Sequence, residues 1–359
     1  MPLTTTTEIS APVNNVFQVN LLRNAKALAT YFTGTTPAEV GEHQGTFTAK
    51  WRRIENLNPK TTPLAELTGG VAFPTRTADQ PSITDISATV SKYGNFLYLN
   101  EEVDLVNFNG QGEKLSEVLG INAGQSLNRL QRNVMEDDST AVFGGGATTA
   151  TGVGGAGITL SDIAVAVNGL NNQNALRFLP QTTGSQNVGS SPIRTAYWGI
   201  THVDTEEDIR LLTGFNSVET YAGQTETAPG EIGHVGGVRW IVTTEASVDA
   251  TAGLSITGTA TVAGRTTGAA TQYDLYNSMI YGMDAAGSVG FGFEHVKNTY
   301  RVGDTLPGVL MVSHPKGSAG SADPLNEVAS VGWKSWHAAV ILNGNWIRVV
   351  RHTTSKLQL

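Results

Sequence analysis

The chain has 359 residues, of which 40% are hydrophobic and 15% charged, and its formal net charge at pH 7 is −8. This length allows two or three compact units, because single cores stop growing near roughly 250–300 residues, and it excludes a very small or disordered protein. The acidic balance argues against a protein whose main task is to grip nucleic acid, and the absence of Cys excludes disulfides, thiolate zinc sites and Cys nucleophiles.

The charged fraction is low beside the roughly one quarter that is typical of soluble domains. It indicates that much of the surface meets other subunits through neutral polar and apolar contacts, a bias that secreted β-rich proteins share. The opening residues, Met1 to Glu8, lack a basic segment followed by an apolar one, and no apolar run approaches the roughly 20 residues of a membrane span. We therefore expect the protein to be made in the cytosol and to stay there.

Residues 1–45 combine a Thr-rich start with one predicted helix, Val19 to Phe32, which is typical of a terminal arm or of an ordinary N-terminal helix. Extended chain follows at Thr46–Ile54 and at Asp85–Val90, continued by Asn95–Asn100, where apolar and polar residues alternate. About thirty proline-rich residues separate the two and exclude a helix or a sheet interior. This order predicts two long strands with an irregular tip, either as a projecting arm or as a hairpin lying flat on its own domain.

Residues 113–138 carry the strongest helical pattern of the chain. Apolar residues recur at three- and four-residue steps along one face, at Leu115, Leu119, Ala123, Leu127, Leu130 and Val134. At 1.5 Å per residue, the pattern predicts a helix on the order of 38 Å long. The glycine-rich segment from Gly144 to Gly157 then predicts a flexible connection that ends the first unit.

Beyond that segment the patterns are mixed. A helix is predicted at Ser161–Leu170, core extended chain at Ile193–Val203, a helix beginning at Asp204, and a strand at Val238–Thr244. The Thr-, Ala- and Gly-rich stretch 250–271 predicts a surface insertion.

Three elements are predicted for the last part of the chain. A helix is expected from Tyr273 to Met283. Two strands, Ala338–Leu342 and Trp346–Val350, are expected to form a hairpin across Asn343 and Gly344.

No residue pattern points to an active site. Gly152, Gly154 and Gly157 satisfy the spacing of a dinucleotide-binding fingerprint, but no strand precedes them and no acidic residue follows about 20 positions later to hold a ribose. The acidic clusters Glu136–Asp138 and Glu206–Asp208 offer carboxylates for acid–base work or calcium, or simply for helix ends. The seven histidines are scattered, so we expect no catalytic residue, no cofactor, no metal and no enzyme.

Two local concentrations of basic residues remain. Lys50, Arg52 and Arg53 flank Trp51, and the tail from Arg348 to Lys356 holds further basic residues. Either concentration could touch DNA. Contact with acidic patches of neighbouring subunits is the favoured interpretation for so few charges.

A further pattern is a series of short stretches that follow one another along the chain and together extend over well over half of it. They are Thr46–Glu55, Thr61–Glu66, Ile86–Asn95, Thr205–Arg210, Gly230–Gly233, Asp323–Asn326, Val331–Lys334 and Ala339–Asn343. In combination and spacing they resemble the coliphage N-four-like family of major capsid proteins. The resemblance implies an α+β fold of the Hong Kong 97 type, found in capsids of tailed double-stranded-DNA bacteriophages. The glycine-rich segment and the stretch after Ala250 have no counterpart in it.

The resemblance also implies a division of the chain into named parts. These are an N-terminal arm (1–45), an extended β-hairpin loop (46–100), a first peripheral part with the spine helix (101–150, helix 113–138), an axial domain with an insertion (151–290, insertion 250–271), and a C-terminal peripheral part (291–359). The hairpin then acts as a strap between subunits, and we expect intersubunit contacts at Trp51, Arg52, Arg53, Lys60 and Tyr93. The Lys–Asn crosslink of the namesake phage has no matching motif here and is not carried over to Lys60.

As function, the resemblance implies self-assembly into an icosahedral shell of hexamers and pentamers that encloses the double-stranded DNA genome without sequence-specific binding. The partners are then other copies of the chain, a scaffolding protein, a portal and a decoration protein. The location is the virion capsid, after assembly in the host bacterial cytoplasm. The alternative is a β-rich surface or adhesin-like binding protein, which the Thr and Gly content favours and the lack of a secretion signal opposes.

Overall fold

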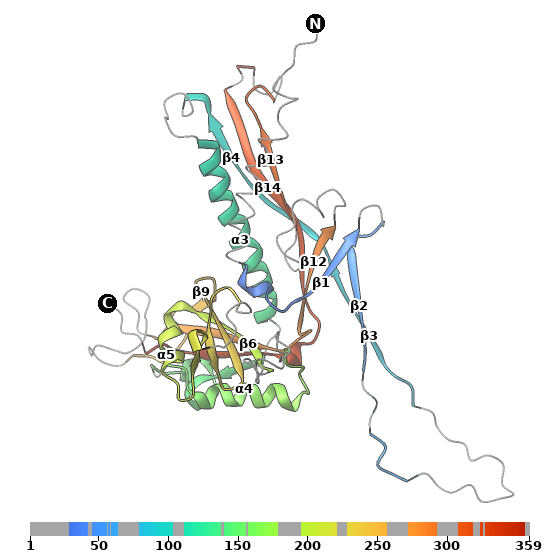
Figure 1. Cartoon of the computed structure of the whole chain (residues 1–359), viewed down its shortest axis with the longest axis vertical. Helices are drawn as coiled ribbons and strands as arrows, with labels where there is room; N and C mark the ends of the chain where they lie inside the picture. The colour runs from blue at the N-terminus through green and yellow to red at the C-terminus, as the bar shows by residue number, and fades with distance from the viewer. Residues whose placement is uncertain are drawn as a thin grey trace, which may run out of the picture.

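The computed structural model describes residues 29–41, 45–55, 57, 59–63, 79–102, 111–137, 140–155, 157–178, 195–220, 228–256, 272–292, 308–318, 324–325 and 327–355. Within them the fold is mixed α+β with three parts (Figure 1). A long helix lies beside an elongated sheet, a compact unit lies at the lower end of that sheet, and a two-stranded ribbon projects away from both.

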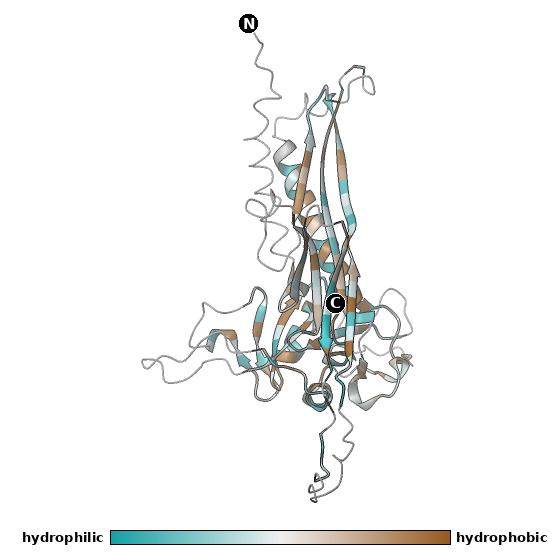
Figure 2. Cartoon of the chain, turned by 90° about the vertical axis from the view of Figure 1, so that its right-hand side faces the viewer, coloured by the Kyte–Doolittle hydropathy of each residue, from teal (hydrophilic) through white to brown (hydrophobic). Residues whose placement is uncertain are grey.

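The elongated sheet has the strand order β1-β12-β14-β13, with β4 also paired to β14. Its strands are β1 (Thr36–Gly41), β4 (Ser91–Asn100), β12 (Ala286–Gly292), β13 (Val309–His314) and β14 (Val328–Ile341). The first part of β14, up to His337, pairs antiparallel with the whole of β4, and the last part pairs with β12. One long strand therefore spans the sheet, and Figure 2 shows hydrophobic and hydrophilic residues interspersed along the strands of the molecule.

Helix α3 (Gln111–Asp137) lies along one face of the elongated sheet. Its Leu119, Ala123 and Leu127 are buried and pack in one cluster with Trp333 of β14. A helix gains most of its stability in a protein from packing an apolar stripe in this way. This packing explains how a helix of 27 residues with internal glycines is maintained.

The compact unit is built on a sheet with the order β5-β15-β11-β6-β9-β8-β7, and β10 also pairs with β11. Its strands are β5 (Thr140–Phe143), β6 (Tyr197–His202), β7 (Asn216–Ser217), β8 (Glu231–Val235), β9 (Val238–Thr243), β10 (Val248–Asp249), β11 (Leu275–Tyr281) and β15 (Ile347–His352). Its helices and helical turns are η2 (Gly144–Gly146), η3 (Ala150–Gly152), α4 (Leu160–Asn172), η4 (Val203–Thr205), α5 (Glu206–Arg210) and η5 (Val218–Thr220).

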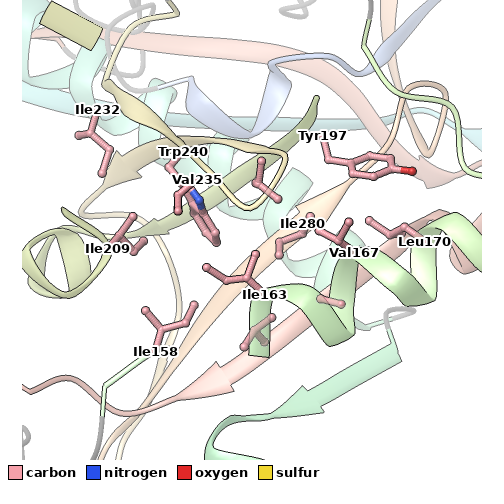
Figure 3. Close-up of a cluster of buried hydrophobic side chains, with 13 residues drawn as sticks. Ile158, Ile163, Val167, Leu170, Tyr197, Ile209, Ile232, Val235, Trp240 and Ile280 are labelled. Atoms are coloured by element: carbon pink, nitrogen blue, oxygen red, sulfur yellow. The ribbon is translucent and has the colours of Figure 1, made fainter. Parts of the chain in front are cut away.

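The core of the compact unit lies between α4 and the sheet. Helix α4 begins at a capping box, in which the Thr159 hydroxyl accepts from the Asp162 N–H and the Asp162 carboxylate accepts from the Thr159 N–H. From α4, Ile163 and Leu170 then point toward Trp240 of β9 and the rest of the buried cluster (Figure 3). The cap fixes where α4 starts and thus which of its faces meets the sheet.

The ribbon consists of β2 (Thr48–Ile54) and β3 (Ile83–Thr89), which pair antiparallel with each other. It projects away from the body (Figure 1), as in the first of the two arrangements that the sequence allows. In both strands, half-buried or buried residues alternate with exposed ones. The ribbon therefore has one face toward the body and one toward solvent.

Two predicted elements are wrong. Within residues 273–283, Leu275–Tyr281 form strand β11 instead of a helix; this strand lies between β15 and β6, and all of its side chains are buried. Its Tyr and Ile residues suit a central strand, where pairing with neighbours overrides local preference. The hairpin across Asn343 and Gly344 does not form either, because η8 (Gly344–Trp346) leads the chain from β14 in the elongated sheet to β15 in the compact unit.

The prediction of a flexible glycine-rich connection is also wrong for the part of that segment that is described. Val153 is buried, and its carbonyl accepts a hydrogen bond of 2.9 Å from the Leu254 N–H. The carbonyl of Gly154 accepts one of 2.5 Å from the Thr353 hydroxyl. These partners come from distant parts of the chain, so the small residues of this segment allow other segments to pack closely against its backbone.

Of the remaining predicted elements, Asn95–Asn100 is extended as expected but belongs to β4, which pairs with β14 in the elongated sheet and not with β2 in the ribbon. Strands β2, β3 and β9 and helices α3 and α4 occupy the predicted stretches. Residues 1–28 of the arm, 64–78 of the hairpin tip and 257–271 of the insertion lie outside the description, which begins near η1 (Thr30–Phe32). Both large sheets take strands from both sides of residue 290, and the named domain limits stay predictions.

Candidate intersubunit surfaces

The inner face of the ribbon anchors it to the body. Ala49, Trp51 and Ala88 pack in one cluster with Val289 of β12. The Trp51 indole lies against Gly287, where a Cβ atom would approach the ring to 3.1 Å. The missing side chain at position 287 therefore lets the base of the ribbon lie close to the elongated sheet.

The outer face of the ribbon carries an apolar pair at its far end. Ile54 and Ile83 are paired across the two strands, and they are 65% and 54% exposed. Beside them, Arg52 Nε lies 2.9 Å from Asp85 Oδ1, and this hydrogen bond raises the pKa of Arg52 and lowers that of Asp85. Exposed ion pairs add little to stability, and nothing in the described chain covers the two isoleucines.

The backbone edges of the ribbon are a second feature of this surface. Among the described residues, β2 and β3 pair with no strand other than each other. Strand edges of this kind present N–H and C=O groups to which another chain can bond. The ribbon therefore offers a partner both backbone groups and apolar side chains.

The other predicted contact residues on the hairpin already make contacts within the chain. Arg53 lies 2.7 Å from the carboxylate of Glu55 and donates to the carbonyl of Leu342 at 2.9 Å. Lys60 Nζ lies 2.9 Å from Asp79 Oδ1. Of these basic residues, Arg52 and Lys60 keep most of their surface exposed.

Tyr93 lies elsewhere, on the side of β4 that faces α3. It is half-buried and packs in the cluster that contains Leu119. Trp51 and Tyr93 thus belong to the packing of the chain itself. The intersubunit role of all five residues stays a prediction.

The sequence interpretation missed a second exposed surface, on the face of the elongated sheet opposite α3. Phe96 and Tyr98 on β4 are 59% and 70% exposed, and their ring centroids lie 5.2 Å apart in an edge-to-face arrangement. A hollow of about 300 Å³ beside them is lined by Tyr98, His314, Ser318, Val328, Ala329 and Ser330. The aromatic alternation in 95–100 predicts a strand, but only the position of α3 decides which face stays open.

A polar junction joins α3 to the compact unit. Arg129 Nε lies 2.5 Å from Glu245 Oε2, and Arg132 donates to the Glu245 carbonyl at 2.6 Å. The Ser247 hydroxyl donates to Glu136 at 2.5 Å, and burial raises the pKa of this carboxyl. These contacts hold the C-terminal half of α3 beside a polar hollow of about 600 Å³.

The stretches considered for chemistry make ordinary contacts. Within the described ranges, no group of three or more His, Asp or Glu side chains is arranged to hold a metal. In the second acidic cluster, Glu206 pairs with Arg210 at 2.8 Å. Gly157, the last glycine of the dinucleotide-like spacing, faces the Asp208 carboxylate, where a Cβ would approach Oδ2 to 2.9 Å; a negative charge there disfavours a phosphate.

No helix of the described chain is both long and apolar enough to cross a membrane. The prediction that the chain is not an enzyme stays a prediction.

The fold recurs in bacteriophage capsids. A chain of the Ralstonia phage GP4 capsid is similar with a TM-score of 0.61 at 9% identity, over 91% of this chain and 92% of that one. A chain from the head of Helicobacter pylori bacteriophage KHP40 has a TM-score of 0.52 at 11% identity, over 89% and 87%. A chain of the cyanophage Pam1 capsid has a TM-score of 0.50 at 11% identity, over 88% of both chains.

No protein-family model matches the sequence, and no curated protein matches it either. At these identities the likeness to solved structures establishes the fold. The chain therefore has a mixed α+β fold of the kind found in phage capsids.

Proposed function

We propose that this chain is the major capsid protein of a tailed double-stranded-DNA bacteriophage. The observation that carries the proposal is the likeness to a phage capsid chain over about nine-tenths of both chains. The Hong Kong 97-type fold and the coliphage N-four-like family belong to the same proposal, and the short stretches quoted above support them. The protein acts structurally, without catalysis.

In this proposal, copies of the chain close an icosahedral shell of hexamers and pentamers around the genome. The ribbon of one copy lies across its neighbour, with Ile54 and Ile83 turned toward that neighbour. Such a contact joins two different surfaces, and repeating it closes a ring when the rotation between neighbours is that of a hexamer or a pentamer. The exposure of both isoleucines and the unpaired strand edges of the ribbon support this arrangement.

A scaffolding protein, a portal and a decoration protein complete the proposed set of partners, with assembly in the host cytoplasm and a final place in the virion. The low charged fraction of 15% suits a subunit that meets many neighbours. The net charge of −8 suits a wall that does not adhere to the DNA it encloses.

The first test replaces the apolar pair of the ribbon. Fully burying an Ile side chain contributes about 1.5–3 kcal/mol, so Ile54→Ser with Ile83→Ser weakens each contact by several kcal/mol if a neighbour covers both residues. In the isolated chain both are exposed, and we expect unchanged thermal stability. The variant, expressed with the scaffolding protein of its phage, is examined by light scattering and electron microscopy.

The matched control is Thr48→Ser with Thr89→Ser, a pair on the same ribbon face that shares a hydroxyl contact of 3.2 Å at the body end. We expect megadalton shells from the control and none from the isoleucine variant. If both variants form shells of normal yield and stability, the proposal that these ribbon residues contact a neighbouring subunit is wrong.

A larger change tests the whole strap. Deleting Thr61 to Ser82 removes the tip and should abolish shells while the body still folds, because every described strand of the two large sheets lies outside this stretch. Intact and stable shells from this deletion would contradict the strap. A wild-type chain that stays a small monomer with its scaffold would contradict the capsid proposal itself.

A further inference from the structure

A buried chain of three hydroxyl groups and one imidazole crosses the compact unit. It runs from Thr205 in η4 through Thr201 in β6 and Ser278 in β11 to His352 in β15. The first three side chains are 0% exposed, and His352 is 1% exposed. The chain therefore links a helical turn and three strands with no contact to solvent.

The hydrogen-bond directions are fixed at both ends. The Thr205 hydroxyl donates to the carbonyl of His202 at 2.8 Å. At the other end, Nδ1 of His352 lies 2.7 Å from the carbonyl of Thr353. A carbonyl oxygen can only accept a hydrogen bond. The Thr205 hydroxyl hydrogen therefore points to the His202 carbonyl, and Nδ1 of His352 must carry a hydrogen to donate to the Thr353 carbonyl.

Three short contacts lie between these ends. Thr205 and Thr201 are 2.6 Å apart at their Oγ1 atoms, Thr201 Oγ1 and Ser278 Oγ are 2.6 Å apart, and Ser278 Oγ lies 2.7 Å from His352 Nε2. Each is short enough for a hydrogen bond, and each needs one hydrogen. Because Thr205 has already donated, Thr201 must donate to it and Ser278 must donate to Thr201.

This order leaves Ser278 without a hydrogen for His352 Nε2. With a neutral ring, three hydroxyl hydrogens and one ring hydrogen serve five contacts, so one pair of facing atoms has no hydrogen between them. With a protonated ring, Nε2 donates to Ser278 and every contact is a hydrogen bond. The arrangement is one proton short when His352 is neutral.

The groups around the ring act in both directions. Burial is the dominant effect and lowers the pKa of His352, while Asp208 of α5 and Asp162 of α4 favour the charged ring. The Tyr276 ring stacks on the imidazole with centroids 6.5 Å apart, and the tilted His202 ring has its centroid 5.4 Å from that of Tyr276. The two carboxylates and the complete hydrogen-bond chain thus favour the protonated ring, whereas the loss of hydration on burial favours the neutral ring.

We propose that His352 is a buried proton-binding site, and that protonation in the folded state completes the hydrogen-bond chain that ties β15 to β11 and β6. Thr201 is a positioning residue in this site, because it orders the hydrogens without touching the ring. This inference is independent of the capsid proposal.

The test is a pH titration of the full chain by nuclear magnetic resonance, with ¹³C and ¹⁵N labels in the histidine rings. The His352 signal is assigned by its loss in the His352→Gln variant. At neutral pH we expect the hydrogen on Nδ1, and on acidification we expect both nitrogens to become protonated while the chain stays folded. A neutral ring with its hydrogen on Nε2, or no protonation before acid unfolding, would overturn the proposal without any variant.

Variants then test the ordering of hydrogens. In Thr201→Ala, Ser278 is free to donate to Nε2 of the neutral ring, so we expect proton binding to weaken about tenfold, the effect of one hydrogen bond to a charged group. Thr201→Ser keeps the hydroxyl and should bind the proton as the wild type does.

Thr353→Ala is the matched control. It makes the same substitution at a buried threonine next to the ring, and it removes only the hydrogen bond to the Gly154 carbonyl. We expect a lower melting temperature for this control with proton binding within about twofold of wild type. Equal proton binding in Thr201→Ala and Thr353→Ala would show that the hydroxyl chain does not control His352.

Discussion

Replacing Glu231 by Gln should destabilise the compact unit strongly, because it removes the carboxylate charge that neutralises the buried guanidinium of Arg239. Arg239 Nη2 lies 2.6 Å from Glu231 Oε2 and Nε lies 2.8 Å from Oε1, with side chains 5% and 0% exposed. The guanidinium also stacks 4.2 Å from the centre of the Trp198 ring. Breaking a buried pair on one side costs about 3–5 kcal/mol, which corresponds to roughly 10 °C in melting temperature.

The assay is thermal and urea unfolding of the wild type, the Glu231→Gln variant and two controls. Asp85→Asn removes the charge from an exposed pair, for which little change in stability is expected because solvent screens it. Glu231→Met with Arg239→Met removes both buried charges and should recover most of the lost stability. If Glu231→Gln loses no more stability than Asp85→Asn, the reasoning about burial of the pair is wrong.

Three further predictions concern single residues. Gly233→Ala places a Cβ against the carbonyl of Asn216, so it should break the β7–β8 pairing and cost about 2 kcal/mol or more in urea unfolding; wild-type stability would contradict this. Burial lowers the pKa of His337 to about 4, below the unfolded value near 6.5, so its contribution to stability is complete above about pH 6.5 and is lost as the pH falls toward 4, by up to about 3 kcal/mol. Unfolding measured across this window should therefore depend less on pH in His337→Gln, and an unchanged slope would refute the assignment. Asp208→Asn weakens the acceptor for the Thr354 hydroxyl and the Ser355 N–H, both at 3.0 Å, so hydrogen exchange at the Ser355 amide should accelerate, and unaltered exchange would count against this anchor.

The elements that could be predicted from the sequence are those whose signal is local. Helix α3 repeats an apolar stripe over about five turns, from Leu115 to Val134, and that stripe is the face that packs against Trp333. The start of α4 is marked by Thr159 and Asp162, which form the capping box seen in the structure. Strands β2 and β3 alternate because one face of the ribbon is buried and the other is not.

The errors arise where non-local contacts decide the structure. The stretch that forms β11 has no alternation, because both of its faces are buried, and its strand conformation depends on β6 and β15 from distant parts of the chain. Asn343 and Gly344 are typical of a hairpin turn, yet the strands on either side belong to different sheets. Local turn chemistry predicts a change of direction there but not the sheet that the next strand joins.

At the candidate surface, too, the local sequence predicts the strand, whereas contacts with distant parts of the chain decide which side chains are exposed. The sequence places Trp51 and Arg52 on neighbouring positions of a strand, and period-two alternation puts them on opposite faces. Which of the two faces solvent depends on β12, which contributes the glycine beneath Trp51. The exposure of Phe96 and Tyr98 depends in the same way on α3, which covers the other side of β4.

The three parts of the molecule meet at the turn between β14 and β15. The Leu342 N–H donates to the Ala285 carbonyl at 2.9 Å, just before β12, and the Gly282 N–H donates to the Trp346 carbonyl at 3.1 Å, just after β11. The Leu342 carbonyl accepts from Arg53, which lies next to Ile54 at the tip end of the paired ribbon. The turn is therefore bonded to the ribbon and lies in the one backbone connection that leads from β14 to β15. Displacing the ribbon around Arg53 must break or shift its hydrogen bond to this turn. In the proposed shell, a neighbour that binds the ribbon would therefore also act on the connection between the two sheets.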